Sequence, residues 1–264
     1  MPRSTSTGPA LPASVSRASS SARTVSPASP WVSRIWSALC LPLMAYGAAA
    51  RLRNLAVAAS LLALPVAAPA AADPLTLVAL GDSLTQGYGL PQEQGFVPQL
   101  QAWLQENGAE VTVVNAGVSG DTSAGGLARL GWTLEGGADA MIVALGGNDL
   151  LRGLDPAETR ANIDAILSEA SAKDLPVLLI GLPAPGNYGA DYKADFDAIW
   201  PELAQQYGAL LVPNMLAGLS DMPVDQRGGL VQPDGLHPSA DGVNVMVETL
   251  GPEVLKLLAM AQAG

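Results

Sequence analysis

Five short apolar runs alternate with segments of helical periodicity along residues 73–264, and this alternation constrains the fold most strongly. Runs of about four to eight aliphatic residues are short for helices and are typical of buried strands. Strands that alternate with helices favour right-handed crossovers and a parallel sheet. We therefore predict an α/β fold, a three-layer α/β/α sandwich with a five-stranded, mainly parallel, flavodoxin-like sheet. The predicted strands span residues 75–80, 111–114, 140–145, 176–182 and 209–212.

Helices are predicted between these strands and after the last one. In residues 96–106 the apolar side chains recur at helical spacing, and Asp155-Pro156 is typical of a helix start. The stretch 115–117 is predicted to turn, and Pro201 and Pro252 are predicted to kink or split the helices that contain them. The predicted helices span residues 96–106, 121–134, 155–173, 192–206 and 240–261.

The first 72 residues differ in composition from the rest. Residues 1–43 are predicted to be disordered or an over-extended start of the reading frame. Residues 44–72 combine two arginines, an apolar run and small residues, which indicates a secretory signal peptide cleaved after Ala72. An uncleaved anchor is the alternative, although the run is short for a membrane span. We expect residues 73–264 to form one domain in the periplasm or outside the cell.

All 24 acidic residues lie in residues 73–264, beside seven basic ones, which gives this part a net charge of −17. Such a charge argues against partners that are nucleic acid or anionic lipid. The only cysteine, Cys40, lies in the leader, and one histidine offers no transition-metal cluster. We therefore expect no cofactor, no metal, no stable membrane insertion after cleavage, and a monomer that acts on a small molecule.

One serine, one histidine and one carboxylate can be selected without ambiguity. Ser83 follows the first predicted strand, where open α/β sheets place their chemistry. The single histidine, His237, lies three residues after Asp234. A serine needs an oriented base to act as a nucleophile, so these residues form a candidate catalytic triad. The backbone N–H groups of Ser83 and Gly117 and the Asn148 side chain are predicted to form an oxyanion hole.

Each residue also has a plain structural interpretation. Ser83 and Asn148 are polar residues of the kind that cap helices, Gly117 suits a turn, and His237 before Pro238 suits a surface loop. Asp82 is expected to hold its loop rather than take part in the chemistry.

Four blocks in order resemble the SGNH (GDSL) hydrolase family: GDSLTQGYG from Gly81, NAGVSGDTS from Asn115, LGGNDLLRG from Leu145 and DGLHP from Asp234. The segments 120–130, 146–153 and 187–204 resemble the exported bacterial subgroup of acyl-CoA thioesterases, lysophospholipases and arylesterases. This resemblance implies a serine esterase that acts on acyl esters or thioesters through an acyl-serine intermediate. A carbohydrate deacetylase, a catalytically silent binding protein and a nucleotide-binding flavodoxin relative are the alternatives.

The loop 182–192 is predicted to contact the acyl chain. It follows the fourth predicted strand, so it lies at the edge that carries Ser83, and it is mostly apolar. The candidate contacts are Leu182, Pro185 and Tyr188. A packed surface loop without substrate contact is the alternative.

Overall fold

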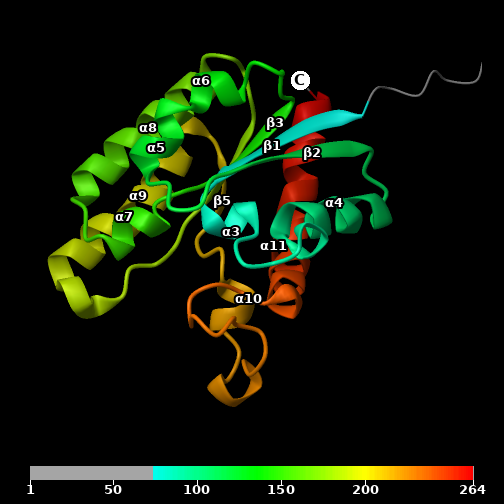
Figure 1. Cartoon of the computed structure of the whole chain (residues 1–264). Coiled ribbons are helices and arrows are strands. Elements are labelled where there is room, and N and C mark those ends of the chain that lie inside the picture. Colours follow the sequence, from blue (N-terminus) through cyan, green and yellow to red (C-terminus); the bar gives the residue numbers. More distant parts are fainter. Residues whose placement is uncertain (1–73, 264) are drawn as a thin grey trace, which may run out of the picture. The chain divides into compact units, whose positions relative to one another are not determined.

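The computed structural model describes residues 74–263, so the predicted leader segments 1–43 and 44–72 lie outside the described residues. Within this part, five parallel strands form one sheet in the order β2-β1-β3-β4-β5 (Figure 1). This confirms the predicted α/β fold and the flavodoxin-like strand order. The strands are β1 (Leu75–Gly81), β2 (Val111–Gly117), β3 (Ala140–Ala144), β4 (Val177–Ile180) and β5 (Leu210–Val212).

Helices follow every strand, as the alternation predicts. The α-helices are α3 (Ser83–Gln86), α4 (Phe96–Glu106), α5 (Ser123–Ala128), α6 (Leu130–Thr133), α7 (Gly147–Leu151), α8 (Pro156–Ser171), α9 (Ala190–Tyr207), α10 (Ala217–Ser220) and α11 (Ala240–Ala263). Short 3-10 helices are η2 (Gln92–Gln94), η3 (Gly186–Tyr188) and η4 (Val224–Gln226).

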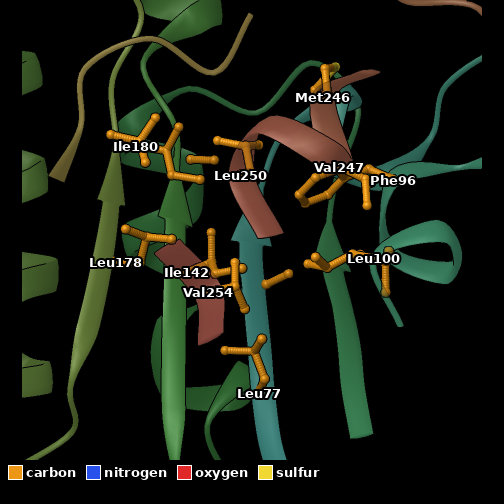
Figure 2. Packing of buried hydrophobic residues seen from close by; sticks show 14 of the residues in the cluster. Leu77, Phe96, Leu100, Ile142, Leu178, Ile180, Met246, Val247, Leu250 and Val254 are labelled. Atoms are coloured by element: carbon orange, nitrogen blue, oxygen red, sulfur yellow. The ribbon is translucent and has the colours of Figure 1, made fainter. Parts of the chain in front are cut away.

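Side chains of the central strands alternate between two apolar cores. In β1, Leu77 and Ala79 pack in the core that contains α4 and α11, whereas Val78 and Leu80 pack in the core that contains α8 and α9. Figure 2 shows Val254 of α11 in the first of these cores. Because both faces of the sheet are covered, its strands read as nearly continuous apolar runs.

Several element boundaries differ from the sequence-based predictions. Residues 115–117 continue β2 rather than turn, because their backbone pairs with β1 as far as Gly81 opposite Gly117. The predicted helix 121–134 is two short helices that meet at Arg129, and the fourth strand is shorter than predicted. The helices α9 and α11 run without interruption past Pro201 and Pro252.

The end of β2 packs directly on the backbone of α3. A Cβ atom on Gly117 would lie 2.3 Å from the Gln86 backbone nitrogen and 2.8 Å from the Gln86 Cα. Since these are backbone atoms, a side chain at Gly117 forces α3 away from the sheet. The position of Ser83 on α3 therefore depends on a glycine at residue 117.

We expect Gly117→Ala to destabilise the protein by about 1–3 kcal/mol, as overpacking does, and to lower activity by displacing α3. The matched control is Gly131→Ala in α6, where an added Cβ has no neighbour within 4 Å. Urea unfolding of both variants measures the difference. Equal stability of the two variants would contradict the packing described for Gly117.

Candidate active site

Ser83 begins the short helix α3 immediately after the central strand β1. The Asp82 side chain caps this helix by accepting a hydrogen bond from the Leu84 backbone N–H at 3.0 Å. The turn is tight, because a Cβ on Gly81 would lie 2.0 Å from Thr85 Oγ1. The glycine and the cap together fix where the Ser83 hydroxyl emerges at the carboxyl edge of the sheet.

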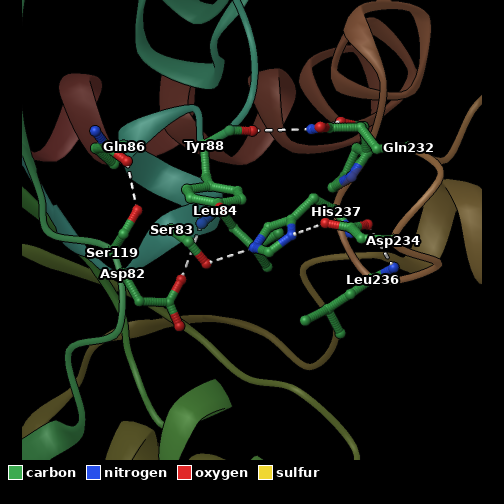
Figure 3. A network of polar contacts seen from close by, with 11 residues as sticks. Asp82, Ser83, Leu84, Gln86, Tyr88, Ser119, Gln232, Asp234, Leu236 and His237 are labelled. Atoms are coloured by element: carbon green, nitrogen blue, oxygen red, sulfur yellow. Dashed lines mark hydrogen bonds and ion pairs between the residues drawn. The ribbon is translucent and has the colours of Figure 1, made fainter.

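His237 comes to the same edge on the long segment between β5 and α11. The Gln232 side-chain amide attaches this segment to the chain after Ser83, since it donates to the carbonyl oxygens of Tyr88 and Pro238, each at 2.9 Å. The Tyr88 ring lies beside the imidazole, with ring centroids 4.8 Å apart (Figure 3). These contacts hold the imidazole next to α3.

A continuous hydrogen-bonded relay joins Asp234, His237 and Ser83 (Figure 3). His237 Nδ1 lies 2.6 Å from Asp234 Oδ2, and His237 Nε2 lies 2.8 Å from Ser83 Oγ. A carboxylate only accepts hydrogen bonds, so Nδ1 carries the proton of the neutral ring and Nε2 is left to accept from the hydroxyl. The structure thus brings together the three residues that the sequence selects as a triad.

The Asp234 carboxylate is held in its ionised form. Hydrogen bonds from the backbone N–H groups of His237 and Leu236, together with the His237 ring, lower the Asp234 pKa to about 2. The two backbone bonds measure 3.0 and 2.9 Å. An ionised carboxylate at this position fixes the tautomer of the imidazole and stabilises its protonated form.

Asn148 lies on α7, in the turn that follows β3, and its side chain contacts Asp82. Its Nδ2 donates to Asp82 Oδ2 over a long 3.4 Å contact, which leaves its other amide hydrogen free for a ligand. Asp82 is 5% exposed, and this burial raises its pKa to about 6 against the opposing bond from Leu84. Asp82 therefore supports two elements of the site, the start of α3 and the Asn148 side chain.

The structure contradicts the prediction that the Gly117 N–H is available to an oxyanion. That group donates to Asn115 Oδ1 at 2.9 Å, and Gly117 is still part of β2. Three residues later, Gly120 occupies a turn with φ of +86°, closed by a bond from Asp121 N–H to the Val118 carbonyl. Within residues 74–263 the Gly120 N–H has no acceptor, so Gly120 is the better candidate for a backbone donor.

The Gly120 turn is fixed to the element that carries Asn148. The Arg152 guanidinium, at the end of α7, donates to the Gly120 carbonyl at 2.6 Å. The signal that could have found Gly120 is a glycine two residues before Thr122, the N-cap of α5, because a glycine allows the positive φ of a turn at that point.

The buried carboxylate of Asp149 also stabilises the region around Asn148. Asp149 is 1% exposed and accepts hydrogen bonds from the Ser123 N–H at 2.8 Å, from the Ser123 hydroxyl and from the Thr159 hydroxyl at 3.2 Å. Asn162 of α8 in turn donates to Ser123 at 3.0 Å. These bonds tie α5, α7 and α8 together directly behind Asn148, as fully paired buried polar groups do.

A pocket of about 220 Å³ opens beside Ser83, His237 and Asn148. Its wall is mainly apolar, and it includes the predicted contacts Leu182 and Pro185. We call it the catalytic pocket. Sequence reasoning missed five leucines in its wall, which come from α3, from α7 and from the long segment between β5 and α11: Leu84, Leu150, Leu151, Leu216 and Leu236.

The structure does not bring Tyr188 to this pocket. Its hydroxyl donates to the Leu151 carbonyl at 3.4 Å, and its ring lies 4.9 Å from that of Tyr192. The side chain therefore packs beside Leu151 and Tyr192 and does not form part of the wall made by Leu182 and Pro185.

Comparisons with known proteins agree with this geometry. Residues 79–245 match the GDSL-like lipase/acylhydrolase family. The chain is 39% identical to esterase TesA of Pseudomonas aeruginosa over 67% of its own length and 86% of that protein. It is 35% identical to thioesterase 1/protease 1/lysophospholipase L1 of Escherichia coli K12, over 67% and 82%. The crystal structure of AlinE4, an SGNH-hydrolase family esterase, superposes with a TM-score of 0.58 at 43% identity, over 72% of this chain and 99% of that one.

The chain belongs to the GDSL-like lipase/acylhydrolase family, and it is a carboxylic ester hydrolase. The resemblance to the SGNH hydrolases drawn from the four sequence blocks is thereby confirmed. None of the helices between residues 74 and 263 has the length and apolar character that crossing a membrane requires.

We expect Asp82→Asn to change the pH dependence of stability. The Asp82 carboxyl titrates near 3.8 when exposed and near 6 in the folded protein. Its contribution to stability is therefore full below pH 3.8 and is lost as the pH rises through 6. Relative to the wild type, the variant should gain about 2–3 kcal/mol between pH 4 and pH 8.

Thermal unfolding across this pH range measures the effect. Asp225→Asn, at an exposed position of η4, controls for the removal of one negative charge. A parallel pH profile for Asp82→Asn and the wild type would show that burial does not raise the pKa of Asp82.

Proposed function

We propose that the protein hydrolyses acyl esters and thioesters through a covalent acyl-Ser83 intermediate. The observation that carries this proposal is the unbroken relay from Asp234 through His237 to Ser83 at the mouth of an apolar pocket. An oriented base within 2.8 Å of a serine hydroxyl is what nucleophilic catalysis by serine needs. This arrangement also argues against a silent binding protein.

The relay supports a two-step mechanism. Ser83 Oγ attacks the acyl carbonyl carbon while its proton passes to His237 Nε2, and Asp234 stabilises the resulting imidazolium. The tetrahedral intermediate then collapses, and His237 returns the proton to the departing alcohol or thiol. In the second step water attacks the acyl carbon and loses a proton to His237. The second tetrahedral intermediate then collapses, His237 returns the proton to Ser83 Oγ, and the free acid is released.

Three donors are proposed to stabilise the negative oxygen of both tetrahedral intermediates. They are the Ser83 N–H, the Asn148 side-chain amide and the Gly120 N–H, which replaces Gly117 in the role predicted from sequence. Two observations on residues 74–263 support this set: the Gly117 N–H donates to Asn115 Oδ1, and the Gly120 N–H has no acceptor there. Loss of one such donor typically lowers kcat by about 10² to 10³.

The wall of the catalytic pocket favours an acyl chain over a sugar. Leu182, Leu150 and Leu216 line it, and burial of each methylene in such surroundings gains about 0.8 kcal/mol. We therefore propose medium-length acyl esters, with thioesters, lysophospholipids and aryl esters as substrate classes. The name of the Escherichia coli relative supports the thioester and lysophospholipid classes. A carbohydrate deacetylase would be expected to present several hydrogen-bonding side chains in the same wall.

The site of action is proposed to be outside the cytoplasm. The composition of residues 44–72 supports a signal peptide, with the domain at 73–264 released as a monomer into the periplasm or the medium. The charge of −17 on that domain also argues against lasting attachment to an anionic membrane surface.

A chain-length series of p-nitrophenyl esters tests the substrate proposal. We expect kcat/KM to rise from acetate through butyrate to octanoate, because each longer chain buries more apolar surface. Leu182→Ser should flatten this rise while it spares acetate. Tyr188→Ser, in the same loop but outside the pocket, is the matched control and should keep the wild-type profile.

Ser83→Ala completes the series as a variant without the nucleophile and should lose about 10⁴-fold or more in kcat. If acetate is the best substrate, or if Leu182→Ser keeps the rise, the acyl-chain proposal is wrong and deacetylation gains support. Hydrolysis that survives Ser83→Ala at a tenth of the normal rate would contradict the mechanism itself.

A further inference from the structure

A second hollow lies next to the catalytic pocket and shares a wall with it. This outer pocket has a volume of about 160 Å³. Leu216 and Leu236 line both hollows, so their side chains separate them. The rest of the outer pocket is also largely apolar, with a polar end: it includes Leu219, Val231 and Pro238, and Arg227.

We infer that the outer pocket receives the distal end of a long, linear acyl chain whose carbonyl carbon is at Ser83. Leu236 then acts as the specificity-determining side chain, because it decides whether a chain stops in the catalytic pocket or continues beyond it. This inference rests on the proposed esterase function and deepens it by naming a substrate class, esters of about ten to twelve acyl carbons.

The volumes of the two pockets indicate the length at which an acyl chain must pass from the catalytic pocket into the outer pocket. A group the size of a water molecule occupies about 30 Å³, so the catalytic pocket holds about seven such groups. An acyl chain longer than about seven carbons therefore needs further space. The outer pocket adds room for about five groups by the same measure.

The wall can move without disturbing the relay. The Leu236 N–H donates to Asp234 Oδ1 at 2.9 Å, and the Gly235 N–H donates to the Gln232 carbonyl at 3.0 Å. These bonds fix the backbone beside His237, whereas the Leu236 side chain is 47% exposed. Exposed side chains change rotamer within nanoseconds, so a turn of Leu236 can join the two hollows.

The lining of the outer pocket also includes the polar residues Ser220 and Arg227, which limit the chain that it accepts. Arg227 Nε donates to the Met222 carbonyl at 2.8 Å, and its terminal nitrogen donates to the Ser220 carbonyl. No carboxylate pairs with this guanidinium in the part of the chain described here. An apolar chain gains nothing from reaching a hydrated cation, so the acyl chain is expected to end before Arg227.

The test fills the outer pocket with a larger side chain at a residue that does not line the catalytic pocket. Val231 is 36% exposed and lines the outer pocket but not the catalytic one. In Val231→Phe the ratio of kcat/KM for p-nitrophenyl dodecanoate to that for the butyrate should fall at least about tenfold, because each buried methylene is worth about fourfold. Both esters are kept below the concentration at which the longer one aggregates.

Val224→Phe is the matched control. It makes the same change on the same segment, at a residue that is 79% exposed and lines neither hollow, so the ratio should stay at the wild-type value. Leu236→Ala is the opposite change. It removes part of the wall and should raise the ratio about threefold or more, as an opened path for a few methylenes would.

Unfolding midpoints of all three variants show whether each is folded. If Val231→Phe is not folded, Leu236→Ala alone tests the outer-pocket inference. An unchanged ratio in the folded Val231 or Leu236 variant overturns the outer-pocket inference, while butyrate hydrolysis that depends on Ser83 leaves the esterase proposal standing. Butyrate hydrolysis that does not depend on Ser83 contradicts the proposed function instead.

Discussion

The pairing of β1 with both neighbouring strands is the constraint on which the site depends. Gly81 lies opposite Gly117 of β2 and opposite Ala144 of β3, with all three strands parallel. The segments that follow these strands must therefore leave the sheet at one edge, where they bring Ser83 and Asn148 into one pocket. The long segment that carries His237 is placed by contacts of its own, which the Gln232 side chain provides.

Buried polar groups give this edge its rigidity and also make it sensitive to substitution. Asp149 is fully paired with hydroxyl and amide donors, whereas Asp82 meets one short bond and one long one and has a raised pKa. A carboxyl group held in that state destabilises the folded protein at neutral pH. The structural role of Asp82 lies in its two contacts, one to the start of α3 and one to Asn148.

The sequence predicted what depends on local pattern and on strand order. Apolar periodicity was enough for the parallel sheet, and the single histidine was enough for the relay with Ser83. The misassigned features depend on tertiary pairing. The sequence around Gly117 is typical of a turn, but pairing with β1 continues β2 as far as Gly117. The Gly117 N–H then donates to Asn115 Oδ1. Tyr188 belongs to an apolar loop in the sequence, but its side chain contacts Leu151 and Tyr192 instead of the catalytic pocket. The wall made by Leu216 and Leu236 brings together two residues far apart on the long segment between β5 and α11, so it leaves no local signal.

Covalent trapping of the nucleophile tests the central claim most directly. A p-nitrophenyl alkylphosphonate resembles the tetrahedral intermediate and transfers its phosphorus to an activated serine, with release of p-nitrophenol. The account predicts one adduct per chain, located by peptide mass spectrometry on Ser83, with activity lost in proportion to the adduct. An adduct on another residue, or full esterase activity in protein modified completely at Ser83, would contradict it.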